Sequence, residues 1–257
     1  NRDFRDLYLD NWGMTIKWEG TFSDRLSAQA RVSTSSLYID NKSEGFSADV
    51  RSSFEKYSNT INDTRFISEV QLQLNENTTL ETGYTLTDYN LRFDQRNDEN
   101  SVDSRRDQNA LTHSTFISYN KNWNDKVTAN LGMHADYFEP NKRFYADPRL
   151  SVNISLSDAL YLKTSAGRSH QFIQKKLRDD FDDFNDQSQF WYLPDATTSV
   201  LEGYQAMIGA LYNRSGWLFD VELYSRNTKN VTVQTNTSTL EEGKLKSKGA
   251  DLFIKKR

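Results

Sequence analysis

Hydrophobic and polar residues alternate with a period of two along most of the chain, whereas helical periodicity is scarce. The segment 126–138 shows this best, because Val127, Leu131 and Met133 fall on one side while Thr128 and His134 fall on the other. Successive side chains of a β-strand point to opposite faces, so each such segment has one apolar face and one polar face. The pattern predicts an all-β protein built from long amphipathic strands.

The alternation predicts eleven strands joined by connections that are short and long in turn. The expected strands lie at 12–19, 25–38, 64–74, 78–93, 110–121, 126–138, 148–156, 159–168, 199–213, 216–228 and 247–255. Tight polar turns are expected at Gly20–Asp24, Asn75–Asn77, Asn122–Asp125, Ser157–Asp158 and Arg214–Ser215, and long polar loops at 39–63, 94–109, 139–147, 169–198 and 229–246. We interpret the strand-like segment 46–57 as a hairpin arm inside the first long loop, because counting it as a spanning strand would break this order.

Short turns at one end of an antiparallel sheet and long loops at the other are typical of an outer-membrane β-barrel. Most of the expected strands have about 10–14 residues, which is enough to cross a bilayer, against about 5–6 in a soluble sheet. Aromatic residues near the strand ends fit the girdles of such barrels, although aromatic residues favour strands in general. These residues are Trp12, Trp18, Trp123, Tyr137, Tyr161, Tyr212 and Trp217.

Composition narrows the class of protein further. Only 36% of the 257 residues are hydrophobic, which suits a barrel with a polar interior, while 13% aromatic residues argue against disorder. The net charge of −4 gives no reason to expect a nucleic-acid partner, and the absence of cysteine excludes disulfides and thiolate sites. No run approaches the roughly 18 apolar residues of a membrane-spanning helix. Because single-chain barrels have an even number of strands, we expect eleven strands to be part of a larger barrel.

A strand, a tight turn, a second strand and a long loop follow one another across 148–198. The residues concerned are Pro148–Val152, Leu156–Asp158, Leu162–Arg168 and His170–Ile173, followed by Trp191 and Pro194 in the loop. This series resembles TonB-dependent outer-membrane receptors, most closely the nutrient-uptake type of the Bacteroidota. Ile61–Tyr84 and, more weakly, Lys248–Leu252 resemble the same family, so that the resemblance spans most of 12–255.

The resemblance implies an antiparallel up-and-down transmembrane β-barrel that is incomplete here, about half of the family's 22 strands. Residues 1–257 would be part of one transmembrane barrel domain, with the plug domain and the last strands absent. The resemblance also implies a location in the bacterial outer membrane, in contact with its lipid, and coupling to the TonB–ExbB–ExbD system through the missing plug. The substrate would be a small molecule, a peptide or a glycan, and a surface lipoprotein lid is a candidate partner.

The loop 169–198 is the candidate ligand-contact site, because it combines carboxylates with aromatic rings on a rigid scaffold. Ring stacking with hydrogen bonding suits a carbohydrate, and carboxylate oxygens suit Ca²⁺, although the loop lacks the glycine and the terminal Glu of an EF-hand. A packed external lid or partner surface is the favoured interpretation of this loop, with ligand contact second and calcium binding third. The candidate ligand-binding residues are Asp179, Asp180, Asp182, Asp183, Trp191 and Tyr192.

The sequence contains no G-x-S-x-G, H-E-x-x-H or P-loop pattern, so we expect no enzyme activity and no cofactor. We also expect no metal site: His113, His134 and His170 are distant in sequence, and zinc at His134 beside Asp136 is the less favoured interpretation. The sequence therefore favours a receptor that imports a nutrient with the proton-motive force. The alternatives are a non-energised structural or adhesion barrel and, less favoured, a barrel-borne lipase or protease.

Overall fold

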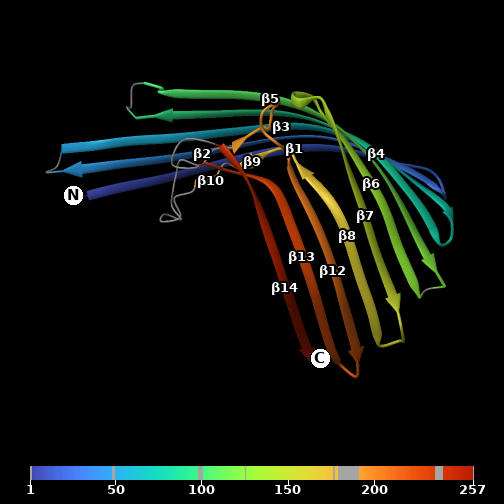
Figure 1. The fold of residues 1–257 in the computed structure, drawn as a ribbon. Helices are drawn as coiled ribbons and strands as arrows, with labels where there is room; N and C mark the ends of the chain where they lie inside the picture. Colours follow the sequence, from blue (N-terminus) through green and yellow to red (C-terminus); the bar gives the residue numbers. More distant parts are fainter. Residues whose placement is uncertain are drawn as a thin grey trace.

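The computed structural model describes residues 2–47, 50–97, 101–124, 126–175, 177–178, 191–234 and 240–256. Eleven long strands in these ranges form one antiparallel up-and-down sheet, in which each strand pairs with the next one along the chain (Figure 1). The long strands are β1 (Arg2–Ser23), β2 (Leu26–Ser47), β3 (Val50–Asn75), β4 (Thr78–Arg96), β5 (Ser104–Trp123), β6 (Val127–Phe138), β7 (Arg143–Ser155), β8 (Leu160–Gln171), β12 (Leu201–Arg214), β13 (Trp217–Gln234) and β14 (Leu240–Lys256).

Four short elements accompany the sheet. A 3₁₀ turn, η1 (Glu139–Asn141), links β6 to β7. The connection from β8 to β12 contains β9 (Gln174–Lys175), β10 (Leu177–Arg178) and β11 (Trp191–Tyr192). Strands β9 and β11 pair with each other, while β10 pairs in parallel with the end of β13. The sequence-based expectation of an all-β, up-and-down architecture with eleven long strands is confirmed.

Two of the tight turns contain residues with positive φ. The β12–β13 turn has Ser215 at φ 53° and Gly216 at φ 78°, and the β5–β6 turn has Asn124 at φ 52°. Two successive residues with positive φ give the turn that best matches the right-handed twist of a β-hairpin, and glycine and asparagine adopt this region at low cost. These turns keep the hairpins in register at one end of the sheet.

The segment 46–57 was expected to be a hairpin arm inside a loop; it does take part in a hairpin, but the arms of that hairpin are continuous with β2 and β3. Residues 50–57 belong to β3, which continues without interruption to Asn75, and the first long loop is replaced by extensions of β2 and β3 that pair as far as Ser47 and Val50. Strands β4, β5, β13 and β14 also reach far into segments that were expected to be loops. Hydrophobic residues in these extensions, such as Phe54 and Tyr57, do not recur at every second position, so the alternation ends there although the backbone ladder continues.

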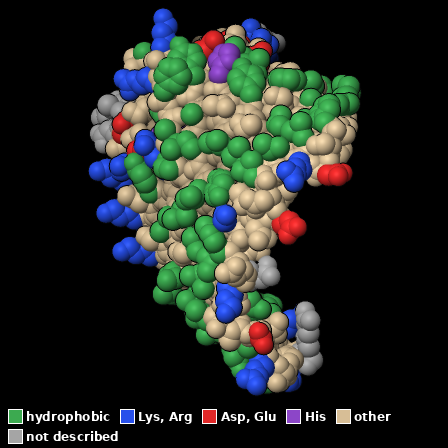
Figure 2. All heavy atoms as spheres, turned by 90° about the vertical axis from the view of Figure 1, so that its right-hand side faces the viewer, with side chains coloured by type: hydrophobic (Ala, Val, Ile, Leu, Met, Phe, Trp, Pro, Cys, Tyr) green, Lys and Arg blue, Asp and Glu red, His purple; other side chains and the backbone are tan. Residues whose placement is uncertain are grey.

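The register separates the side chains of the sheet into two faces, because residues paired across antiparallel strands share a face. One face, which we call the outer face, carries exposed apolar side chains along every long strand; Figure 2 shows hydrophobic side chains spread across it, with Lys and Arg mostly at its rim. Its members include Trp12, Met14, Ile16, Val32, Phe66, Val70, Ile117, Leu131, Met133, Leu150, Ile208, Val221, Leu223, Leu252 and Ile254. The opposite, inner face is mainly polar in its half near the tight turns.

The sheet is twisted and open. Figure 1 shows β1–β5 and β12–β14 running in clearly different directions, as the accumulated twist of a large sheet requires. Among the described residues, β1 pairs only with β2, and β14 pairs only with β13, so the sheet does not close on itself. An unclosed sheet of this kind agrees with the expected incomplete barrel. None of the described residues belongs to a helix long and apolar enough to span a membrane.

Candidate functional site

The inner face carries ion pairs and carboxylates near the tight turns. Lys163 lies 2.9 Å from Asp220 and also contacts Glu222, which joins β8 to β13 across β12. Glu69 and Glu81 line a cavity of about 450 Å³ in the same half of the inner face, together with Glu19 from β1. This part of the inner face is hydrophilic and offers carboxylate oxygens to whatever fills the interior.

The connection between β8 and β12 folds back and packs on the inner face at the opposite end. Leu91 and Phe138 of the sheet form an apolar cluster with Phe172, Leu193 and Val200 of the connection. The Phe138 side chain is fully buried, and its ring stacks on Phe172 with 4.8 Å between centroids. The connection and the sheet together form the only hydrophobic core cluster found among the described residues.

Polar anchors fix this connection to several strands. The Gln108 side chain of β5 donates to the Leu193 carbonyl and accepts from the Leu193 N–H, both at 3.1 Å. Asn59 of β3 accepts a hydrogen bond of 3.2 Å from the Trp191 N–H. The Tyr192 hydroxyl lies 2.8 Å from Gln174 Oε1 and 2.6 Å from Thr232 Oγ1 on β13. These bonds replace the water that the buried backbone groups of the connection would otherwise need.

The predicted ligand-contact residues fall into two groups. Asp179, Asp180, Asp182 and Asp183 lie outside the described residues. Trp191 is half-buried, and Tyr192 is 4% exposed with its hydroxyl bonded within the protein, which makes Tyr192 an anchor of the connection in this conformation. Burial raises the pKa of the Tyr192 hydroxyl. Ligand contact at these positions stays a prediction.

The Asp195 carboxylate caps the last residues of the connection before β12 by accepting hydrogen bonds from Thr197 and Thr198. Its Oδ1 accepts hydrogen bonds from the hydroxyl and the N–H of Thr197, at 2.7 and 2.8 Å, and from the same groups of Thr198, both at 3.1 Å. These bonds, the Thr197 hydroxyl first, hold the pKa of Asp195 below its ordinary value. The cap orders residues 195–198 just before β12 begins.

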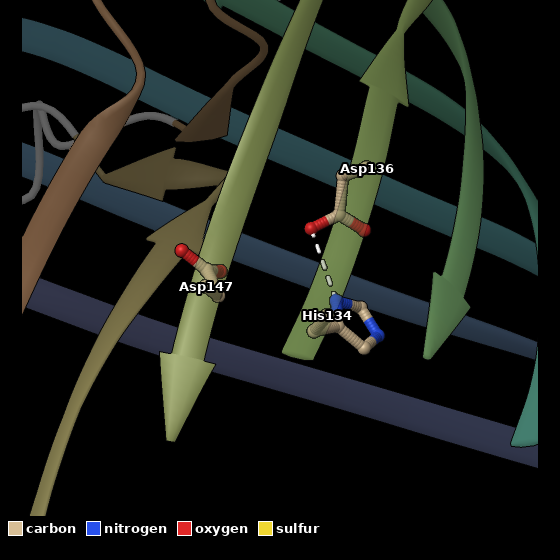
Figure 3. Close-up of side chains that lie close together, drawn as sticks. All are labelled: His134, Asp136 and Asp147. Atoms are coloured by element: carbon tan, nitrogen blue, oxygen red, sulfur yellow. Dashed lines mark hydrogen bonds and ion pairs between the residues drawn. The ribbon is translucent and has the colours of Figure 1, made fainter. Parts of the chain in front are cut away.

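A cluster of histidine and aspartate side chains lies on the inner face beneath this connection. His134 and Asp136 project from β6 and Asp147 from neighbouring β7 (Figure 3), and one ligand atom of each lies within 4.8 Å of the others. His134 Nδ1 lies 3.2 Å from Asp136 Oδ2, and Asp147 accepts bonds from His170 Nδ1 at 2.7 Å and from the His170 N–H at 3.0 Å. The cluster borders a cavity of about 290 Å³ that Phe172 also lines.

The sequence pointed to half of this cluster. His134 and Asp136 share the polar side of one predicted strand, and that pairing is visible in the alternation. Asp147 was assigned to the loop 139–147, but the structure begins β7 at Arg143 and pairs Asp147 with His134. Extending the alternation of 148–156 back by one residue, across Pro148, would have revealed the second carboxylate.

Comparison with known proteins identifies the fold. No protein-family model and no curated protein sequence matches this chain. Among solved structures, the RagAB peptide transporter matches 98% of the chain with a TM-score of 0.62 and 13% identity. FpvA of Pseudomonas aeruginosa, bound to heterologous pyoverdines, matches 96% with a TM-score of 0.69 and 11% identity. The siderophore receptor PirA from Pseudomonas aeruginosa matches 95% with a TM-score of 0.54 and 10% identity. The chain has the fold of a TonB-dependent receptor barrel.

The match covers only part of each receptor. The chain spans 35% of the RagAB chain, 38% of FpvA and 53% of PirA. The receptor-barrel fold explains the two faces of the sheet, since such a barrel has an apolar band outside and a polar interior.

Proposed function

We propose that this chain is part of the barrel of an outer-membrane receptor that imports a nutrient. The observation that carries the proposal is the combination of an apolar outer face with a polar inner face, in a sheet that matches receptor barrels over nearly its whole length. Hydrocarbon would cover the outer face, so the protein would reside in the bacterial outer membrane in contact with its lipid.

In this proposal residues 1–257 form part of one transmembrane barrel domain, about half of a 22-stranded barrel. A plug domain elsewhere in the complete protein would couple import to the proton-motive force through the TonB–ExbB–ExbD system. Among the described residues, one edge of β1 and one edge of β14 are unpaired. These edges support a place in a larger barrel, because a membrane-spanning sheet needs every edge strand paired. The solved relatives are transporters and receptors rather than enzymes, and we propose no enzymatic role for this chain.

The substrate would be a small molecule, a peptide or a glycan that meets the connection between β8 and β12. RagAB transports peptides and FpvA binds pyoverdines, so one barrel architecture serves different ligands. Asp179, Asp180, Asp182 and Asp183 would supply hydrogen-bond acceptors, and Trp191 and Tyr192 would supply ring faces, on a segment that the inner face holds in place. A surface lipoprotein lid is a further partner in this proposal, and it rests on the resemblance to nutrient-uptake receptors alone.

Growth and uptake test the proposal. A strain without the complete gene is compared with its parent on defined peptides, glycans and iron-siderophores as sole nutrient sources. We expect a growth defect on one nutrient class, and we expect inactivation of TonB to cause the same defect without adding to it. A defect that persists equally with and without TonB would instead indicate a non-energised barrel.

Location and ligand contact are tested separately. The complete protein should fractionate with the outer membrane, require detergent for extraction and show heat-modifiable gel mobility. Trp191→Ala should reduce uptake, whereas Trp123→Ala, at the tight turn on the opposite end of the sheet, should leave uptake unchanged. Equal uptake by both variants and the parent would remove the connection from the ligand path.

A further inference from the structure

Two buried carboxylates face each other on neighbouring strands of the inner face. Asp136 is 4% exposed and Asp147 is 2% exposed, and Figure 3 shows them across the gap between β6 and β7 with His134 beside them. Ligand atoms of the three side chains lie within 4.8 Å of one another. Placing two negative charges so close in a buried site is costly unless a positive charge lies between them.

Arg65 and Arg149 line the cavity that the two carboxylates share. Within the described ranges, however, neither Asp136 nor Asp147 lies within ion-pair distance of a lysine or an arginine. His170 Nδ1 contacts Asp147, while His170 Nε2 lies 3.2 Å from an Arg168 guanidinium nitrogen and 3.9 Å from Glu202 Oε1. The two carboxylates therefore lie side by side without a direct ion pair to a lysine or an arginine in the described part of the chain.

A second observation points to an additional group in this cavity. The hydroxyl of Thr112, a residue that is 3% exposed, has no hydrogen-bond partner, and Thr112 lines the same cavity as His134, Asp136 and Asp147. Buried hydroxyls are nearly always paired, so an orphan hydroxyl marks a place where a water or an ion-bound water belongs. Thr112 lies on β5, two residues before Ser114, whose hydroxyl donates to Asp136.

We propose that His134, Asp136 and Asp147 bind a divalent first-row transition metal ion, with Zn²⁺ as the test ion. One imidazole nitrogen and two carboxylate oxygens are a donor set that zinc accepts, and mixed nitrogen and oxygen ligation disfavours calcium. Zinc–ligand bonds of about 2.1 Å place neighbouring tetrahedral ligands about 3.4 Å apart. The 3.2 Å between His134 Nδ1 and Asp136 Oδ2 is close to that separation, and the other ligand pairs, which lie within 4.8 Å, need closure by at most about 1.4 Å.

The surroundings hold the ligands in place. Ser114 bonds Asp136, and both the ring and the backbone N–H of His170 bond Asp147, so each carboxylate is oriented by a neighbour that is not itself a ligand. The remaining coordination position opens on the cavity of about 290 Å³, where water bonded to Thr112 or a donor atom of a solute completes the shell. The ion would cross-link β6 and β7 directly beneath the connection that starts after His170.

Calorimetry with Zn²⁺ alone tests the site on the complete protein in detergent. We expect one ion per protein, and at least a tenfold weaker affinity in His134→Asn and Asp147→Asn. The matched control is His113→Asn, because His113 lies on the outer face and bonds Tyr84 instead. Heat-modifiable mobility verifies that each variant is folded. No saturable binding, or equal affinity in all variants, would overturn the proposal.

X-ray absorption on the zinc-loaded parent protein gives a test that needs no variant. We expect a nitrogen and oxygen shell at about 2.0–2.1 Å that contains a single imidazole. Two or more imidazoles would place the ion elsewhere and overturn the assignment. Excess Ca²⁺ should fail to displace the zinc, and displacement would refute the transition-metal class. These results are independent of transport, so the metal site can fail while the proposed import function stands, or the reverse.

Discussion

Gln108→Ala should release the connection between β8 and β12 from the inner face. Gln108 makes two hydrogen bonds of 3.1 Å with the backbone of Leu193, a residue that is 2% exposed. Each such bond contributes about 1 kcal/mol net, so the variant should weaken docking of the connection by about 2 kcal/mol. A difference of about 2 kcal/mol corresponds to a roughly 30-fold change in the ratio of docked to undocked protein.

Amide hydrogen exchange on the complete protein measures this change at Leu193 itself. Exchange of the Leu193 amide should accelerate about 30-fold, because local opening limits exchange of a buried, bonded N–H. Gln73→Ala is the matched control, since Gln73 also makes two side-chain hydrogen bonds, with Asn75 and Thr79, but lies at the tight-turn end. A change of less than about threefold in Gln108→Ala, or an equal change in both variants, would refute the anchoring role.

Three further perturbations test the core, the outer face and the cap. Phe138→Ala should destabilise the folded protein by about 3–5 kcal/mol, because it empties a fully buried position, whereas Phe138→Leu should cost far less; unfolding in detergent by denaturant measures both. Leu150→Arg should weaken folding into lipid vesicles by about 2–4 kcal/mol, while Ser151→Arg, on the inner face of the same strand, should cost much less. Because the pKa of Asp195 is depressed in the folded state, its cap contributes fully above the unfolded pKa of about 3.9 and is lost as the pH falls through the folded value. Protection of the Thr197 amide, corrected for intrinsic exchange, should therefore fall in acid, and in Asp195→Asn it should be lower at neutral pH and independent of pH.

The strand pattern could be predicted because it reflects a local property of the chain. Val127, Leu131 and Met133 alternate with polar neighbours, and the structure places these three on the outer face of β6. Two tight turns could also be predicted, since Asn124 and Gly216 adopt positive φ, which asparagine and glycine tolerate best. Periodicity and turn chemistry act over a few residues, so one sequence suffices to find them.

The ends of the strands could not be predicted by the same signal. Residues 46–57 were expected to form a hairpin arm inside a loop, and the structure instead makes residues 46–47 the end of β2 and residues 50–57 the start of β3. The signal for a strand is regular alternation of hydrophobic and polar residues, and Phe54 and Tyr57 in the extension of β3 stand three residues apart. Only the pairing of one strand with its neighbour determines how far such an extension reaches.

The candidate site depends on contacts that are distant in sequence. The Tyr192 hydroxyl bonds Thr232, 40 residues away, and Gln108 bonds Leu193 across 85 residues. Asp147 approaches His134 because β6 and β7 pair in one register, and a shift of one residue would turn Asp147 to the outer face. Register is a property of the assembled sheet.

The sequence alone determined that this chain forms long strands with one apolar and one polar side, and that their connections alternate between short and long. Each strand carries that information in its own side chains, whose direction follows from the backbone. The tertiary structure decided that the segment after β8 folds back onto the inner face and that two aspartates and a histidine meet beneath it. Those contacts join residues that only the paired sheet brings together. They can stabilise the folded protein only after the strands have paired.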